Sequence, residues 1–158
     1  MKSLPKHLQP RWRYLGVALY GWPDARIDRG SFQRSLWYAA QNLLGDPESA
    51  ASNLRVFEFR FDDGVGEAVV RVRRGYVSEA RAALACIDDI DGHPVGVRVR
   101  GVSGTVRACE EKYLGRRREC SSERRVVFEN AERRARARDG LLDVRTNDAF
   151  TGATDLDT

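Results

Sequence analysis

The side chains best suited to bind a ligand lie between Val95 and Leu114, where arginines precede a glycine-rich turn and a helix. Apolar and polar residues alternate through 95–100, as in a strand with one buried face, and Arg98 and Arg100 lie on the polar side. Apolar residues then recur at helical spacing from Val106 onward. Turn amides and a helix N-terminus attract anions. We therefore predict a phosphate-contacting corner at Gly101, Ser103, Gly104, Thr105 and Arg107, with Lys112 about two turns along the helix.

Further arginines share the polar face of the predicted sheet. Arg71 and Arg73 alternate with valines in one strand, and tyrosines lie on the same face. Aromatic rings among arginines favour single-stranded RNA, by stacking and phosphate contact. The third strand carries no aromatic residue, which favours recognition of phosphate and shape over base reading. The predicted RNA-binding residues of the sheet and N-terminal arm are Arg71, Arg73, Arg98, Arg100, Lys6, Arg11 and Arg13. Alternatively, these arginines simply form the solvated face that any antiparallel sheet exposes.

The composition is that of a basic protein with an unusual preference for arginine. The 158 residues carry a net charge of +4, and lysine occurs only at positions 2, 6 and 112, so 24 of the 27 lysines and arginines are arginine. Arginine suits bidentate phosphate contacts and stacking on bases. A GC-rich genome produces the same bias, and composition does not separate the two explanations. No apolar run approaches the roughly 20 residues of a membrane span, and no signal peptide is evident, so we expect a cytoplasmic protein.

Few residues could support catalysis or metal binding. Cys86, Cys109 and Cys120 are unevenly spaced, and His7 and His93 are the only histidines. Neither a zinc ligand set nor a nucleophile with a partner base is recognisable. We predict no catalytic residue, no metal site and no cofactor bound by the protein.

The order of the predicted elements indicates an α+β fold. The sequence favours strands at 11–22, 54–61, 67–73 and 95–100, and helices at about 28–44, 77–87 and from 105 onward, with a linker at 46–53. This order predicts a ferredoxin-like (RRM-like) split βαβ fold with a four-stranded antiparallel sheet, helices on one face, an extra helix and a C-terminal extension. The strand residues expected to face the core are Leu15, Val17, Leu19, Phe57, Phe59, Phe61, Val70, Val72, Val95, Val97 and Val99.

The chain divides by composition into four segments. We expect a basic N-terminal arm at 1–10, the RNA-binding domain at 11–128, an arginine-rich extension at 129–145, and a disordered acidic tail at 146–158. Residues 124–128 could add a short strand, whereas 132–138 fit a strand or a weak helix. In the first helix, Trp37 and Leu44 widen the apolar stripe beyond what one sheet needs, so we predict that they contact another protein.

Three segments resemble, in order, the archaeal ribonuclease P protein component 2 family, which is related to the eukaryotic Pop-five subunit. They are residues 36–45 (LWYAAQNLLG), residues 68–75 (AVVRVRRG) continuing into 79–84 (EARAAL), and residues 101–114 (GVSGTVRACEEKYL). The resemblance covers roughly residues 6–128. It implies a non-catalytic protein subunit of ribonuclease P, a ribonucleoprotein endonuclease of tRNA processing that removes the 5′ leader of precursor tRNA.

The resemblance also implies partners. In that family the ribonuclease P RNA carries the chemistry with bound Mg²⁺, and contact with precursor tRNA is indirect. The protein pairs with component 3, a TIM-barrel subunit, alongside other ribonuclease P proteins, and two such pairs can join as a dimer of heterodimers. Two alternatives remain open at this point. A regulatory ferredoxin-like module would bind a small molecule at a dimer interface, and a ribosome-associated factor would bind RNA without depending on component 3.

Overall fold

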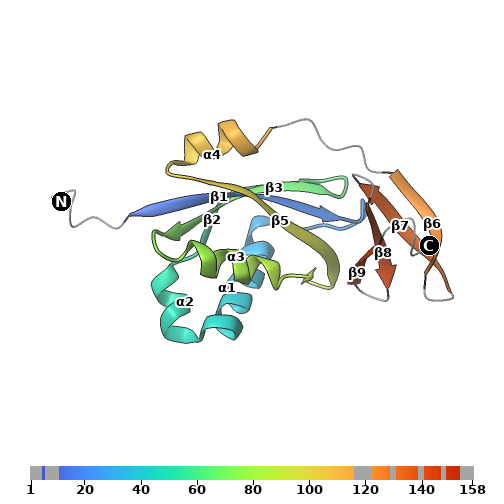
Figure 1. The fold of residues 1–158 in the computed structure, drawn as a ribbon, viewed down its shortest axis with the longest axis horizontal. Helices are drawn as coiled ribbons and strands as arrows, with labels where there is room; N and C mark the ends of the chain where they lie inside the picture. Colours follow the sequence, from blue (N-terminus) through green and yellow to red (C-terminus); the bar gives the residue numbers. More distant parts are fainter. Residues whose placement is uncertain are drawn as a thin grey trace.

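The computed structural model describes residue 5 and residues 11–115 in full. Beyond them it describes the strands β6 (Ser122–Phe128), β7 (Ala131–Arg138), β8 (Leu141–Thr146) and β9 (Ala149–Ala153). Residues 11–115 form a mixed α/β body, shown in Figure 1.

The body is built on a five-stranded antiparallel sheet. Its strands are β1 (Trp12–Gly21), β2 (Arg55–Asp62), β3 (Val65–Arg73), β4 (Asp89–Ile90) and β5 (His93–Ser103), in the order β2-β3-β1-β5-β4. The prediction of four strands is therefore wrong by one short strand. Strand β4 pairs with the start of β5 across a turn at Asp91 and Gly92, where both residues have positive φ, as tight hairpin turns require. Two residues are too few to produce an alternating pattern.

Three helices cover one face of this sheet, and a fourth lies on the other face (Figure 1). The first three are α1 (Arg29–Leu44), α2 (Asp46–Ser52) and α3 (Val77–Ala85), and the fourth is α4 (Val106–Tyr113). Helix α1 is capped by Asp28, whose carboxylate accepts a hydrogen bond from the Ser31 amide, and Gly45 follows its last residue. Helix α2 replaces the predicted linker. Pro47 lies in its first turn, and Asn53 ends it in the left-handed conformation.

The core lies between the sheet and helices α1 and α3. Ten of the eleven predicted core-facing strand residues are buried there or pack against it. Phe57 is the exception, because the register between β2 and β3 shifts between Val56 and Glu58. This β-bulge turns Val56 into the core and Phe57 to the opposite face.

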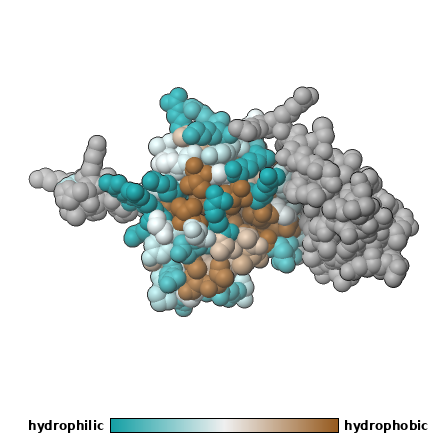
Figure 2. Space-filling view, in the orientation of Figure 1, coloured by the Kyte–Doolittle hydropathy of each residue, from teal (hydrophilic) through white to brown (hydrophobic). Residues whose placement is uncertain are grey.

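The surface of the body is hydrophobic beside one edge of the sheet, which is the outer edge of strand β5. Strand β4 pairs only with His93 and Pro94, so among the described residues no strand pairs with the rest of the outer edge of β5. Figure 2 shows hydrophobic residues between α4 at the top and the other helices at the bottom, in the region where Figure 1 draws β5 and α3.

The C-terminal strands form a second antiparallel sheet in the order β6-β7-β8-β9. Residues 132–138, for which the sequence left strand and helix open, lie in strand β7. Strand β9 lies within residues 146–158, the segment expected to be disordered, and its backbone pairs with β8 from Leu142 opposite Ala153 to Thr146 opposite Ala149. Pairing with β8 supplies partners for backbone groups that an isolated tail would leave to water.

Candidate nucleic-acid interface

Helix α4 covers the middle of the sheet face opposite α1 and α3, the face that the sequence predicted to be polar and to bind RNA. Ala18, Val69 and Cys109 are fully buried beneath it or within it. The ring of Tyr113 lies against the backbone of Gly16 and Gly101, where an added Cβ would collide with it. Gly101 therefore continues β5 and gives room to Tyr113, whereas the sequence had placed it in the phosphate-contacting corner.

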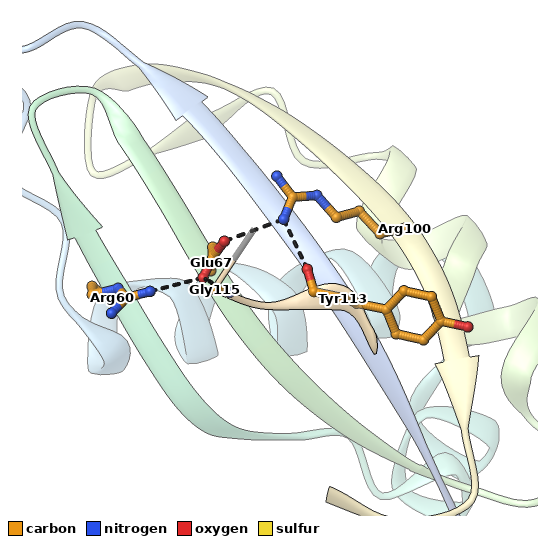
Figure 3. A network of polar contacts seen from close by, with 5 residues as sticks. All are labelled: Arg60, Glu67, Arg100, Tyr113 and Gly115. Carbon is orange, nitrogen blue, oxygen red and sulfur yellow. Dashed lines mark hydrogen bonds and ion pairs between the residues drawn. The ribbon is translucent and has the colours of Figure 1, made fainter. Parts of the chain in front are cut away.

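A carboxylate on β3 fastens the end of α4 to the sheet (Figure 3). Glu67 accepts hydrogen bonds from Arg60 Nη2 at 2.9 Å, Arg100 Nη1 at 3.2 Å and the Gly115 amide at 3.1 Å. Arg100 Nη1 also donates to the Tyr113 carbonyl at 2.9 Å. Glu67 thus links strands β2, β3 and β5 to the residues that close α4.

Arg100 is engaged in this linkage, and its side chain is only 20% exposed. Burial opposes its charged form, but the hydrogen bonds and charges of Tyr20 and Glu67 outweigh burial, so the pKa of the Arg100 guanidinium is raised. Arg100 lies at a second register shift, where Gly16 faces Gly101 and Val17 faces Val99, which leaves Arg100 unpaired with β1. Its position favours a structural role in holding α4.

Beside α4, aromatic rings and arginines gather at the start of β1. We call this group the Trp12 cluster, and its members are Trp12, Tyr14, Arg55, Phe57, Arg71 and Arg73. The Cζ atom of Arg71 lies 3.8 Å from the centroid of the Trp12 ring and 4.8 Å from that of Phe57. The Arg73 Cζ is 5.7 Å from Trp12, and the Arg55 Cζ is 5.9 Å from Phe57. The Tyr14 and Phe57 rings are 5.9 Å apart.

Helix α1 fixes the β-bulge that brings Phe57 into this cluster. The buried Gln33 side chain accepts a hydrogen bond from the Val56 amide at 2.6 Å and donates to the Leu54 carbonyl at 3.4 Å. Arg29 Nη1 donates to the Val56 carbonyl at 3.0 Å. These bonds hold the backbone on the N-terminal side of Phe57, which places the ring on the face opposite the core.

The described residues supply no negative charge to balance the arginines of the Trp12 cluster. Within the described residues, none of Arg55, Arg71 and Arg73 forms an ion pair with a carboxylate. Burial lowers the pKa of the Arg71 guanidinium, and the nearby Arg55 lowers it further, against an opposing contribution from Tyr14. Arginine stays protonated all the same. The cluster therefore presents several positive charges around aromatic rings.

The predicted corner adjoins this cluster. Ser103 pairs with Tyr14, which in turn pairs with Arg71 on its other side. Ser103 is buried, and its hydroxyl has no hydrogen-bond partner among the described residues. Thr105 caps α4 by accepting a hydrogen bond from the Ala108 amide at 3.1 Å. A Cβ at Gly104 would lie 4.0 Å from Arg13 Nη1, so the arginine predicted for the N-terminal arm lies beside the corner.

The remaining predicted residues are more dispersed. Arg107 is exposed and pairs with Glu111 one turn along α4, while Arg11, Arg98 and Lys112 are exposed without a carboxylate partner in the described part of the chain. Lys6 lies outside the described residues.

Of the two α1 residues predicted to contact another protein, Trp37 is exposed and Leu44 is not. Trp37 is 48% exposed, and its Nε1 donates to the Leu54 carbonyl at 2.7 Å. Leu44 packs against the core, whereas Tyr38 and Leu43 are exposed.

Sequence reasoning missed three members of the Trp12 cluster as binding candidates. In the predicted strand 11–22, alternation puts Trp12 on the same face as Tyr14, but sequence reasoning assigned it no role. Alternation assigned Phe57 to the core, and Arg55, two residues before it, received no role. The available signal was Gln33, an amide on the otherwise apolar side of α1 that can bond the backbone of a neighbouring strand.

Other classes of site have no basis in the described residues. Within that part of the chain, no three histidine, cysteine, aspartate or glutamate side chains lie close enough together to hold a metal ion. None of its helices is long and apolar enough to cross a membrane.

Comparison with known proteins identifies the family. Residues 13–114 match the model of the Rpp14/Pop5 family. The chain is 56% identical over 158 residues to "Ribonuclease P protein component 2" of Halorubrum lacusprofundi, covering 100% of this chain and 99% of the relative. It is 59% identical over 157 residues to the protein of the same name from Natronomonas pharaonis, covering 99% and 98%.

More distant relatives match over a shorter length. The Thermococcus gammatolerans protein of the same name is 34% identical over 113 residues, which cover 72% of this chain and 91% of the relative. A chain in the cryo-EM structure of yeast ribonuclease MRP aligns with a TM-score of 0.47 at 17% identity, over 63% of this chain and 79% of that one. The family model spans nearly the whole described body, and the first two relatives align from end to end. The chain belongs to the Rpp14/Pop5 family.

Proposed function

We propose that this chain is a protein subunit of ribonuclease P and supports the enzyme's RNA in removing the 5′ leader of precursor tRNA. The observation that carries the proposal is the end-to-end match to relatives named ribonuclease P protein component 2. In this role the chain is part of an endoribonuclease without supplying catalytic groups, and the RNA performs the cleavage with its own Mg²⁺. The protein itself holds no cofactor and acts in the cytoplasm.

We propose further that the body is a ferredoxin-like fold with two additions. The order β2-β3-β1-β5, with α1 and α3 on one face, agrees with two interleaved βαβ units. Strand β4 and helix α4 are then the additions. On this view α4 closes part of the sheet face that RNA-recognition modules leave open, and RNA contacts concentrate beside α4.

The proposed mechanism is electrostatic. Arginines without carboxylate partners neutralise phosphates that crowd together when the RNA folds around its metal ions. The geometry favours the Trp12 cluster and the adjoining corner with Arg13 and Gly104, because these bring positive charge and backbone amides to one end of the sheet. Exposed Arg98 on β5 adds a further arginine without a carboxylate partner among the described residues, and exposed Arg107 on α4 would exchange its pairing with Glu111 for a phosphate.

Protein partners are proposed for the opposite face. Component 3, the TIM-barrel subunit, is the expected partner, and two such pairs can assemble as a dimer of heterodimers. The exposed apolar side chains of α1 support a protein contact there, namely Trp37, Tyr38 and Leu43. Leu44 contributes less than expected because it packs against the core.

Reconstitution tests the proposal. Precursor tRNA cleavage by the ribonuclease P RNA and component 3 is measured over a range of Mg²⁺ concentrations, with and without this chain. We expect the chain to lower the Mg²⁺ concentration needed for half-maximal rate. Unchanged cleavage would overturn the proposed function. If Arg98→Ala and Arg107→Ala variants work at the same Mg²⁺ concentration as the parent, the electrostatic role of these two residues is wrong.

A further inference from the structure

We propose that the Trp12 cluster binds one unpaired nucleotide, whose base stacks on the exposed aromatic surface while arginines contact the neighbouring phosphate. The inference rests on the proposed role as an RNA-binding subunit, and it goes beyond the phosphate and shape recognition that the sequence favours. It names the ligand as single-stranded RNA and the contact as stacking.

The aromatic half of the site is already assembled. Trp12, Tyr14 and Phe57 come from two strands separated by β3, and all three rings are partly exposed. The Arg71 guanidinium lies over Trp12 at 3.8 Å and over Phe57 at 4.8 Å, so it bridges the two rings. Such a bridge orders the rings before a ligand arrives, which reduces the entropy that binding must overcome.

In the part of the chain that the structure describes, the charged half of the site lacks a counterion. Arg55, Arg71 and Arg73 surround the rings, and no carboxylate of the described residues pairs with them. Arg100, by contrast, is paired with Glu67. A purely structural cluster would be expected to include such a carboxylate, because neighbouring guanidinium groups repel one another. The missing charge is therefore assigned to the ligand.

The combination of rings and unpaired arginines selects the ligand class. A duplex keeps the faces of its bases stacked inside the helix and offers mainly phosphates, so it has no use for the rings. An unpaired base offers a planar face to the rings and a phosphate to the arginines. Arg13 lies beside Gly104, but it alternates with Trp12 and Tyr14 along β1 and pairs with the core residue Val72, so the site is formed by Arg55, Arg71 and Arg73.

Binding of two labelled RNAs to the full-length chain tests this assignment. One probe is a single-stranded decanucleotide and the other is a hairpin duplex with the same number of phosphates, both followed by fluorescence anisotropy. Trp12→Leu removes a ring without removing charge. We expect this variant to bind the single strand about tenfold more weakly, because one base loses its stacking partner. Binding of the duplex should be unchanged. The salt dependence should also stay the same, because every arginine that neutralises a phosphate remains in place.

Two further variants separate stacking from misfolding. Trp12→Phe keeps an aromatic face and should retain most of the affinity for the single strand. Tyr38→Leu removes a ring that is 69% exposed on the opposite face, in the surface proposed for a protein partner, and should leave the binding of both RNAs by the isolated chain unchanged. Each variant is compared with the parent by thermal unfolding, so that weak binding by a destabilised protein is recognised.

The outcomes distinguish this inference from the proposed function. If Trp12→Leu binds the single strand as tightly as Tyr38→Leu does, stacking at the Trp12 cluster is wrong, and the electrostatic role survives provided that reconstitution still depends on the chain. If the parent binds neither probe and leaves precursor tRNA cleavage unchanged, the proposed function fails as well. Equal reductions in affinity for Trp12→Leu and Trp12→Phe would also overturn the stacking interaction.

Discussion

Cys109 is the buried residue that reports most directly on how α4 is held. Its side chain is fully buried between α4 and the sheet, whereas Cys86 is exposed near the end of α3. Burial, together with a smaller contribution from the charge of Glu110, raises the pKa of the Cys109 thiol to about 11. Only about one thiol in a thousand is then ionised at pH 8. The two cysteines should therefore differ sharply in reactivity.

We expect iodoacetamide to label Cys86 rapidly at pH 8 and Cys109 only when α4 moves away from the sheet, because the thiolate is the reactive form. Peptide mapping by mass spectrometry follows each cysteine separately. Equal labelling rates in the native protein would contradict the burial of Cys109.

The raised pKa of Cys109 also makes the stability of the protein depend on pH. The unfolded chain releases this proton at lower pH than the folded chain, so the contribution of Cys109 to stability is complete below about pH 9 and declines as pH rises toward 11.

The sequence could predict the role of a residue where that role depends only on its neighbours in the chain. Helix α1 runs from Arg29 to Leu44, close to the predicted range of about 28–44. Phe57 was not predictable in this way, because a bulge of one residue reverses the faces of everything before it in the strand. The bulge depends on Gln33, which is 23 positions away in the sequence. Local alternation contains no information about such a contact.

At the scale of elements, α4 is held by packing at Tyr113 and by the Glu67 carboxylate. Glu67→Gln removes the ion pairs with Arg60 and Arg100 and leaves Arg100 half-buried without a countercharge. We expect a decrease of about 1–3 kcal/mol in the free energy of unfolding, as for hydrogen bonds to charged groups. Labelling of Cys109 should become faster because α4 detaches more often. Urea denaturation and cysteine mapping measure the two effects.

Glu111→Gln is the matched control for this substitution. It removes an equal charge from an exposed pair with Arg107, one turn along the same helix. Exposed pairs of this kind contribute roughly 0.3–0.5 kcal/mol. Equal effects of the two variants would show that Glu67 does not fasten α4.

The close approach of Tyr113 to the sheet leads to a second prediction for α4. A Cβ at Gly16 would lie 2.5 Å from the Tyr113 Cβ, so Gly16→Ala must displace the helix. We expect a decrease of about 1–3 kcal/mol in stability, typical of overpacking. Gly96→Ala is the control, since the nearest atom to its added Cβ is 4.0 Å away. Thermal unfolding of both variants provides the measurement, and similar melting temperatures would contradict the tight packing.

The longer elements were predictable from periodicity, and the shorter ones were not. Strand β1 and helix α1 each supply several repeats of their pattern. Strand β4 has two residues, and helix α2 has seven, of which only Ser52 is buried. The position of α4 was also unpredictable. Its sequence indicated a helix with one apolar side, but which surface that side covers depends on glycines at 16 and 101, far apart in the chain.

At the scale of the whole molecule, the chain carries a net charge of +4, and the arginines of the Trp12 cluster lie together on the sheet face beside α4. RNA binding through phosphate neutralisation should therefore depend on where arginine lies as well as on how many arginines there are. Arg73→Gln with Arg98→Gln should make the slope of log affinity against log salt shallower by about two, one for each phosphate that is no longer neutralised. Filter binding of the ribonuclease P RNA at several salt concentrations measures the slope.

The matched control for this pair is Arg26→Gln with Arg81→Gln. Both arginines are exposed, Arg26 in the loop before α1 and Arg81 on α3, and their removal changes the net charge by the same amount. An equal change of slope in the two double variants would mean that total charge governs binding and that the face beside α4 has no special part in it.

Strand β1 is enclosed more completely than the other strands of the body 11–115. It pairs with β3 on one edge and β5 on the other, and residues 15–21 are buried, with α4 over part of the sheet face that is opposite α1 and α3 (Figure 1). In deuterated water its amide hydrogens should be among the last to be replaced, and only through opening of the entire body. The outer edge of β5 should exchange much earlier. The exchange rate of the β1 amides would thus report global unfolding, both in the free protein and after assembly with RNA.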